Sequence, residues 1–279
     1  MTNFIIRTLT GIAIVAIQVL CTYYSPISLA ALFLLFAALT VNEFLKITST
    51  LQGVKISRPI IIIASCYLYF VVWLNCITDW MSISLFLPYL LFIIYCFIKE
   101  LYTRNTNPIA NLGIITLSQL YIALPLSLIN VIAFNSFDVY NGQHDFYTIP
   151  LAIYIFIWIN DTGAYLSGST LGKHKLFPRI SPKKSWEGSI GGALLTIISA
   201  WGISHIFTFL SVWQWIGMAI TVVVFGTFGD LTESMFKRQL NLKDSGTLLP
   251  GHGGILDRLD SMLFAIPSVL TYLYILSLL

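Results

Sequence analysis

The stretch SMFKRQLNLKDSGTLLPGHGGILDRLDS, residues 234–261, is a polar segment between two long apolar runs. An unsatisfied polar group is costly inside a bilayer, so a charged segment beside hydrophobic spans marks a candidate functional site. Its glycines permit close approach of a ligand to the backbone. Asp257 and Asp260 share one face if a helix begins there. A solvated loop between two helices is the simpler explanation, but basic and acidic residues alternate here instead of forming one solvated run. The segment is therefore predicted to carry a site.

The composition is that of a membrane protein. The 279 residues are 57% hydrophobic and 10% charged, with a mean hydropathy of +0.84. Soluble domains carry about 25% charged residues. The net charge of +3 is small and dispersed, which argues against a nucleic-acid partner. The four cysteines lie in or beside apolar runs without a CxxC pair, so free thiols are expected.

Apolar runs of about 20 residues predict transmembrane helices. The fold class is therefore an all-α integral membrane protein, a polytopic bundle of about nine transmembrane helices. The predicted spans are 8–23, 27–43, 59–76, 82–98, 109–134, 147–160, 189–211, 213–231 and 261–279.

The distribution of charge predicts the orientation. With a cytoplasmic N-terminus, the inner segments hold all 15 Lys and Arg residues, as the positive-inside rule requires. The two long polar loops, 161–188 and 232–260, are then cytoplasmic. Residues 1–150 are predicted to be hydrophobic N-terminal transmembrane helices. Residues 151–279 are predicted to be a C-terminal transmembrane catalytic region that includes both loops.

A first polar cluster follows the sixth predicted span. Asp161 lies in NDTGAY at a membrane boundary, where a carboxylate is costly without a cation or a donor. The block SPKKSWEG, residues 181–188, adds Lys183 and Lys184, and Ser185 is a candidate helix cap. A capped helix end and the positive-inside rule are the simpler explanations of these residues. The block is not a P-loop, because GxxxxGK[ST] is absent.

A second cluster is made of carboxylates. Asp230 and Glu233 are three residues apart at the end of one predicted span, and Asp257 and Asp260 begin the next. Consecutive spans are usually neighbours, so the four side chains are expected to converge. Carboxylates without thiols or imidazoles favour hard cations such as Mg²⁺. His252 lies in the glycine turn and is either a turn residue or a phosphate contact.

These motifs resemble a known family. The pattern S-x-F-K-R-x4-K-D-S-G-x2-L-P-G-H-G-G-I-L-D-R-L-D-S resembles the signature of the phosphatidate cytidylyltransferases, or CDP-diacylglycerol synthases. The DTGAY and SPKKSWEG blocks resemble upstream segments of the same family. The resemblance covers about residues 158–261, and residues 1–150 match only in being hydrophobic.

The resemblance implies an enzyme of phospholipid biosynthesis. It would transfer CMP from CTP to phosphatidate, a membrane lipid, and release CDP-diacylglycerol and pyrophosphate. The expected location is the plasma (inner) membrane of a bacterium, with the active site on the cytoplasmic side and Mg²⁺ as cofactor. A homodimer is also consistent with the resemblance.

Joining two polyanions requires Mg²⁺ and basic side chains, but neither a strong general base nor a covalent intermediate. Catalytic roles are predicted for Asp230, Asp257, Lys237 and Arg258. Substrate binding is predicted for Asp161, Lys183, Lys184, Arg238, Lys243 and His252. The predicted metal ligands are Asp230 and Asp257, with Asp260 and Glu233 as weaker candidates.

Two alternatives remain at this stage. A transporter or channel also combines many spans with carboxylates, but here the polar residues gather at one face and no inverted pair of broken helices is visible. A CTP-dependent polyprenol kinase, or a cytidylyltransferase for another lipid, would place similar residues at a cytosolic face. The K-R-x4-K-D…HGG…DRLD run favours phosphatidate.

Overall fold

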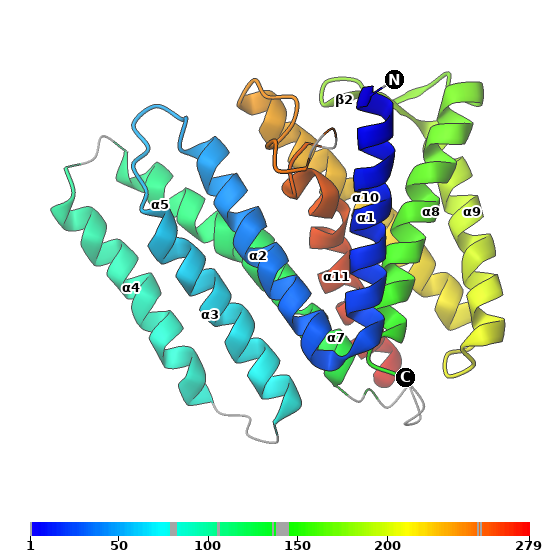
Figure 1. Ribbon diagram of the computed structural model, residues 1–279, viewed down its shortest axis with the longest axis horizontal. Helices are drawn as coiled ribbons and strands as arrows, with labels where there is room; N and C mark the ends of the chain where they lie inside the picture. The colour runs from blue at the N-terminus through cyan, green and yellow to red at the C-terminus, as the bar shows by residue number, and fades with distance from the viewer. Residues whose placement is uncertain are drawn as a thin grey trace. The chain divides into compact units, whose positions relative to one another are not determined.

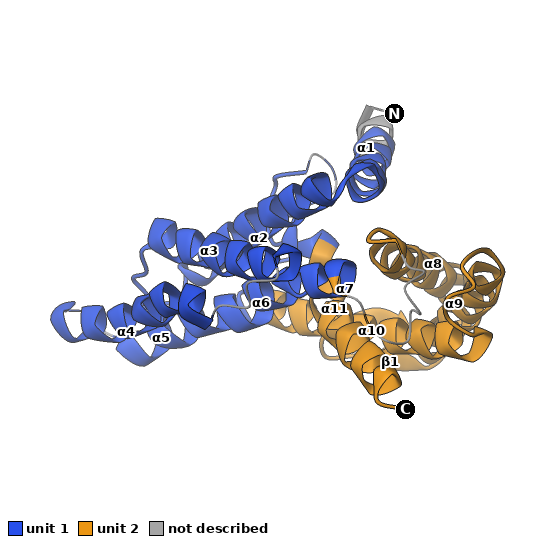
Figure 2. Cartoon of the chain, turned by 90° about the horizontal axis from the view of Figure 1, so that it is seen from below, with its two compact units in different colours: residues 1–134, 239–258 blue, residues 135–238, 259–279 orange. Residues whose placement is uncertain are grey.

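The structure is a computed structural model that describes residues 2–78, 83–104, 107–135, 137, 145–249, 251 and 253–279, with side chains from residue 8 onward. The chain forms two compact units (Figure 2). Unit 1 comprises residues 1–134 and 239–258, and unit 2 comprises residues 135–238 and 259–279. Both units are discontinuous in sequence, and the predicted division at residue 150 stays a prediction.

Helices form most of the described chain. Eight helical segments are long and apolar enough to cross a membrane: Pro26–Thr48, Arg58–Ile77, Ile83–Tyr102, Pro108–Phe134, Thr148–Leu171, Trp186–Ile206, Val212–Gln239 and Leu256–Ser277. A shorter apolar helix, Thr8–Tyr24, corresponds to the first predicted span. The predicted all-α polytopic membrane protein is confirmed.

Unit 1 contains the helices of the first half of the chain. They are α1 (Thr2–Tyr24), α2 (Pro26–Thr48), α3 (Arg58–Ile77), η1 (Ile83–Phe86), α4 (Leu87–Tyr102), α5 (Pro108–Leu117), η2 (Ser118–Ala123), α6 (Leu124–Ser127) and α7 (Ile129–Phe134). Proline lies in the first turn of α2, α3, α4 and α5, where its missing N–H costs no hydrogen bond. Ser25 forms a capping box with Ser28 at the start of α2.

The span Pro108–Phe134 is interrupted in its middle. Its six residues Ser118–Ala123 are π-helical and directly precede Leu124 and Pro125. Proline cannot donate to the preceding turn and its ring crowds the carbonyl four residues back, so the irregularity near Pro125 has a local cause. The buried Gln119 side chain in this segment donates from Nε2 to Ser65 Oγ of α3 at 2.8 Å. The polar group is thus satisfied inside the apolar unit.

Unit 2 contains α8 (Thr148–Leu171), β1 (Lys175–Phe177), β2 (Ser181–Ser185), α9 (Trp186–Ile206), α10 (Val212–Gln239) and the part of α11 (Leu256–Ser277) after Arg258. Strands β1 and β2 form an antiparallel hairpin between α8 and α9. The two helices run side by side (Figure 1). They meet through backbone: a methyl group on Gly163 would lie 2.9 Å from Gly192 Cα. Small residues let helices in a membrane approach this closely.

The helices carrying the polar motifs are longer than the sequence indicated. Helix α8 continues to Leu171, α10 continues to Gln239, and α11 begins at Leu256. The two predicted loops are therefore shorter, and the segment between α10 and α11 is reduced to residues 240–255. A helix satisfies its own backbone hydrogen bonds, so it can run beyond the apolar core. Consequently the carboxylates of both clusters lie on rigid helices.

Candidate active site

A cavity of about 380 Å³ with several charged side chains in its lining lies in unit 2. Five elements line it, namely α8, β2, α9, α10 and α11. Its charged side chains are Asp161, Lys183, Lys184 and Asp230. A cavity of this size with a few convergent polar groups is typical of a small-molecule site. Four residues predicted from two separate stretches of sequence therefore line one cavity.

The β1–β2 hairpin places the two lysines at the cavity. Strand β2 ends at Ser185, whose Oγ accepts a hydrogen bond from Gly188 N at 3.1 Å and caps α9. The predicted cap is thus confirmed. On the hairpin's other side, Arg238 Nε donates to the Ile180 carbonyl at 3.3 Å. These contacts hold the hairpin backbone at α9 and at α10, and thereby position the two lysines of β2.

The carboxylates of Asp230, Glu233 and Asp260 form one cluster. One oxygen of each lies within 4.8 Å of the others. Asp230 and Glu233 share a face of α10, and Asp260 comes from α11. Gly229 permits the approach, since a methyl group there would lie 2.5 Å from the Asp260 carbonyl oxygen. The convergence expected of these three residues is therefore found in unit 2.

Two lysines partly balance the cluster. Lys184 of β2 forms an ion pair with Asp230. Lys237 forms a second ion pair, with Nζ 2.5 Å from an oxygen of Glu233, whose side chain is 1% exposed. The cluster thus places three carboxyl groups against two ammonium groups. Close carboxylates repel each other strongly where water is scarce, so the arrangement favours a bound cation.

The donor set of the cluster fits a hard divalent cation. It offers carboxylate oxygens alone, which suit Mg²⁺ or Ca²⁺ better than zinc or copper. Mg²⁺ commonly binds through one or two carboxylates, with water and substrate phosphates completing its shell. The adjoining cavity gives room for such phosphates. An acidic cluster that could bind a metal is thus present in the described residues.

Other predicted residues belong to unit 1. Lys243 and Arg258 are exposed there. Asp257 accepts backbone hydrogen bonds from Ser245 N at 2.9 Å and from Gly254 N at 2.8 Å. Its carboxylate therefore orders the segment between α10 and α11. The predicted role of His252 concerns a residue outside the described ones.

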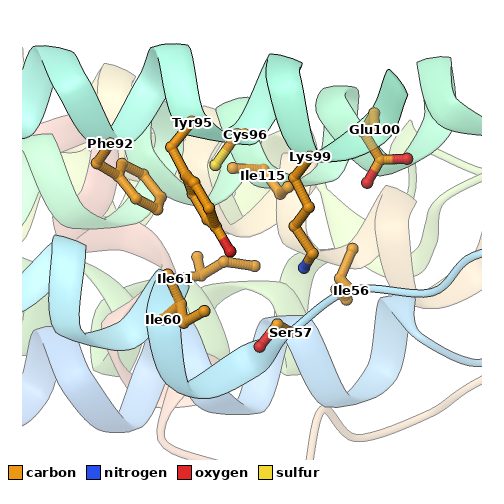
Figure 3. Close-up of a pocket in the computed structure, with 10 residues that line it drawn as sticks. All are labelled: Ile56, Ser57, Ile60, Ile61, Phe92, Tyr95, Cys96, Lys99, Glu100 and Ile115. Atoms are coloured by element: carbon orange, nitrogen blue, oxygen red, sulfur yellow. The ribbon is translucent and has the colours of Figure 1, made fainter. Parts of the chain in front are cut away.

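Two further cavities, both in unit 1, offer less to a polar substrate. The first lies between α3 and α4 and has a volume of about 10 Å³, which is room for no more than about one water molecule (Figure 3). The second, of about 590 Å³, is lined by apolar side chains of α4 and α5 together with Glu100. Among the described cavities, the one in unit 2 combines volume with several charged groups.

One acidic residue of the first half escaped the sequence analysis. Glu43 lies on α2, is 7% exposed, and bonds to the segment between α10 and α11. The available signal was an acidic residue at the edge of an apolar run, which is expensive there and usually serves a purpose. Its partners are more than 200 residues away, so sequence spacing could not identify them.

Comparison with known proteins supports the predicted resemblance. The model of the cytidylyltransferase family matches residues 5–276. The phosphatidate cytidylyltransferase of Staphylococcus aureus (strain COL) is 48% identical over 118 residues, which are 42% of this chain and 45% of the relative. The Staphylococcus saprophyticus enzyme of the same name is 47% identical over 119 residues, again 42% of this chain and 45% of the relative. The aligned stretch thus spans less than half the length of these relatives, whereas the family model spans nearly the whole chain. The chain belongs to the cytidylyltransferase family.

Proposed function

We propose that this protein is a phosphatidate cytidylyltransferase, which transfers CMP from CTP to phosphatidate and releases CDP-diacylglycerol and pyrophosphate. The observation that carries the proposal is the juxtaposition in unit 2 of a carboxylate cluster and a cavity lined by two lysines. Relatives with this printed name share 47–48% identity over the aligned stretch. The proposed location is a bacterial plasma membrane, with the reaction on its cytoplasmic side and a homodimer as one form of the enzyme.

The reaction joins two anionic groups. A phosphate oxygen of phosphatidate attacks the α-phosphorus of CTP and forms a new P–O bond. The bond from that phosphorus to the oxygen bridging to the β-phosphate breaks, and pyrophosphate leaves with its electron pair. The attacking oxygen is already negative, so no strong base is required. Charge neutralisation and alignment are the main requirements.

The residues of unit 2 meet these requirements. Lys183 and Lys184 line the cavity and are assigned to phosphate charge. Lys184 is held beside Asp230 until a phosphate competes for it. Asp161, on the α8 wall, is assigned to orienting a lysine or the cytosine base. Lys237 and Arg238 complete the basic set of α10.

Asp230, Glu233 and Asp260 are the residues that would hold Mg²⁺. When bound, the ion would neutralise phosphate charge and align the two phosphates. The segment between α10 and α11 would supply Lys243 and His252, and α11 would supply Arg258, for the triphosphate or the lipid phosphate. Asp257 was predicted as a further ligand, and that role stays a prediction.

The test is a transfer assay in detergent micelles with radiolabelled CTP, Mg²⁺ and phosphatidate. The wild type should form a labelled liponucleotide and pyrophosphate, and Asp230→Asn should form neither. Asp145→Asn is the matched control, because Asp145 is an exposed aspartate of unit 2 that accepts a hydrogen bond from Tyr147 Oη at 2.8 Å, outside the cavity.

Each alternative has a distinct outcome. Transfer to another phospholipid, or phosphorylation of a polyprenol, with no product from phosphatidate would replace the proposed acceptor. Absence of transfer to any lipid would overturn the proposed activity. The transporter alternative has lost its main support, because the match to the cytidylyltransferase family covers residues 5–276.

A further inference from the structure

Glu43 is a buried carboxylate of α2, a helix of unit 1 to which no catalytic role has been assigned. It lies on α2, and 7% of its surface is exposed. A carboxylate removed from water is unstable unless hydrogen bonds or a cation replace its hydration. Its retention among apolar neighbours therefore requires specific partners.

Those partners come from the polar loop, defined here as residues 240–255, and from the start of α11. Ser245 Oγ donates to Glu43 Oε1 at 2.6 Å. Ile255 N and Leu256 N donate to Oε2 at 2.7 and 3.4 Å. The first N–H groups of a helix lack partners within it, and the helix dipole favours a negative charge at this end. Glu43 thus serves as a cap for α11 from a distant helix.

Two glycines of the loop allow the carboxylate to come this close. A methyl group on either Gly246 or Gly254 would overlap Glu43 Oε1. The sequence suggested that the glycines admit a ligand to the backbone, and in unit 1 the group that approaches them is a side chain of the protein itself. The loop backbone is thus shaped to receive Glu43.

A second carboxylate holds the same loop from its own end. Asp257 accepts hydrogen bonds from Ser245 N and Gly254 N. Ser245 therefore contacts Glu43 through its hydroxyl and Asp257 through its amide. Two carboxylates on different helices thus hold the loop at Ser245 and at residues 254–256, which is more order than a merely solvated connection requires.

We infer that Glu43 is a positioning residue for cytidylyl transfer, holding the polar loop and the start of α11 in the conformation that presents Lys243 and Arg258 to phosphate. The inference rests on the proposed function, which assigns those two basic residues to substrate charge. Glu43 itself touches the loop, not the substrate. Its effect should therefore appear both in the order of the loop and in the kinetics.

The experiment compares Glu43→Gln with Glu100→Gln in the full-length protein. Glu100 is a matched control because it is also a buried carboxylate of unit 1, 9% exposed, and it accepts a hydrogen bond from Asn111 Nδ2 at 3.0 Å, away from the loop. Both variants lose a buried charge, so both should lower the melting temperature. Hydrogen exchange measured by mass spectrometry reports the loop amides, and the micelle assay with CTP and phosphatidate reports kcat and KM.

In Glu43→Gln, exchange of amides between residues 245 and 256 should rise by about 10-fold or more, because hydrogen bonds to a charged group are lost. The value of kcat/KM for CTP should fall by about 10-fold or more. In Glu100→Gln, both quantities should stay within about twofold of the wild type, since no loop contact is removed. Ser245→Ala, which removes one donor and keeps the carboxylate, should give a smaller change of the same sign and serves if Glu43→Gln does not fold.

Unchanged exchange in Glu43→Gln and Ser245→Ala would overturn the inference. So would faster exchange with a kinetic loss no larger than that of Glu100→Gln. A wild type that transfers CMP to no lipid would overturn the proposed function and, with it, the positioning role. An active wild type with equal losses in both glutamate variants would overturn the positioning role alone.

Discussion

The Lys184 ammonium group of β2 forms an ion pair with the Asp230 carboxylate of α10. One member of the pair is proposed to bind phosphate and the other to bind metal. The pair therefore holds both groups at the cavity and must separate, or share its partners, when substrate enters. This coupling leads to the first prediction.

Replacing Lys183 and Lys184 together by Gln should raise the KM for CTP or phosphatidate by about 10- to 100-fold, because charge-assisted hydrogen bonds to phosphate are lost. Of the two single variants, Lys184→Gln should raise KM more than Lys183→Gln, since Lys184 also contacts Asp230. Steady-state kinetics with each substrate varied in turn measures this. Unchanged apparent affinities for both substrates would remove the lysines from the binding site.

Asp260→Asn should weaken binding of a divalent ion by about 10- to 100-fold, because a cluster of three carboxylates becomes one of two. Titration with Mn²⁺ followed by electron paramagnetic resonance measures this without reference to activity. Chelation with EDTA should abolish transfer, and added Mg²⁺ should restore it. Equal Mn²⁺ affinity in wild type and Asp260→Asn, with Asp145→Asn as control, would contradict the metal site.

Asp257→Asn should reduce turnover by about 100-fold or more while the protein still inserts into the membrane. Its carboxylate bonds to Ser245 N and Gly254 N, so hydrogen exchange of these amides should also rise. Mn²⁺ binding distinguishes the two roles: loss of affinity would establish the predicted metal ligand, and retained affinity would establish a role in ordering the loop. Near-normal turnover would exclude both.

Gly192→Ala should destabilise the fold by about 1 to 3 kcal/mol, because a methyl group would lie 2.6 Å from the Asn160 carbonyl oxygen of α8. Gly202→Ala is the control on the same helix: nothing lies within 4 Å of the added carbon. It should stabilise α9 by about 0.5 to 1 kcal/mol through helix propensity. Thermal unfolding in detergent measures both, and equal melting temperatures would contradict backbone contact between α8 and α9.

The membrane spans could be predicted from the sequence because apolar length and proline placement are local properties. The ends of α8, α10 and α11 could not, since polar residues do not stop a helix whose backbone bonds are internal. The placement of Asp230 and Glu233 on one face followed from their three-residue spacing. The partnership of Lys184 with Asp230 did not, because it depends on how a hairpin folds against a helix.

Glu43 illustrates the limit of reading spacing along a chain. Its partners Ser245 and Ile255 are brought to it by the packing of unit 1, and no periodicity relates the three residues. What the sequence did offer was a single acidic residue at the edge of an apolar run, where its cost signals a purpose. The unfavourable burial of a carboxylate marks Glu43 as a residue of interest, but its partners can be identified only from the three-dimensional structure.

The glycine contacts between α8 and α9 bear on how the substrate range of the proposed enzyme can change. Part of the cavity wall is formed where Gly188 faces Ala164, and a methyl group on Gly188 would lie 2.9 Å from the Ala164 carbonyl oxygen. A wall of main chain has no side chain to shorten, and a methyl group added at Gly188 would press α9 away from α8. Natural variation or directed evolution toward a bulkier lipid phosphate would have to act on lining residues with side chains to shorten, such as Tyr165 and Thr227.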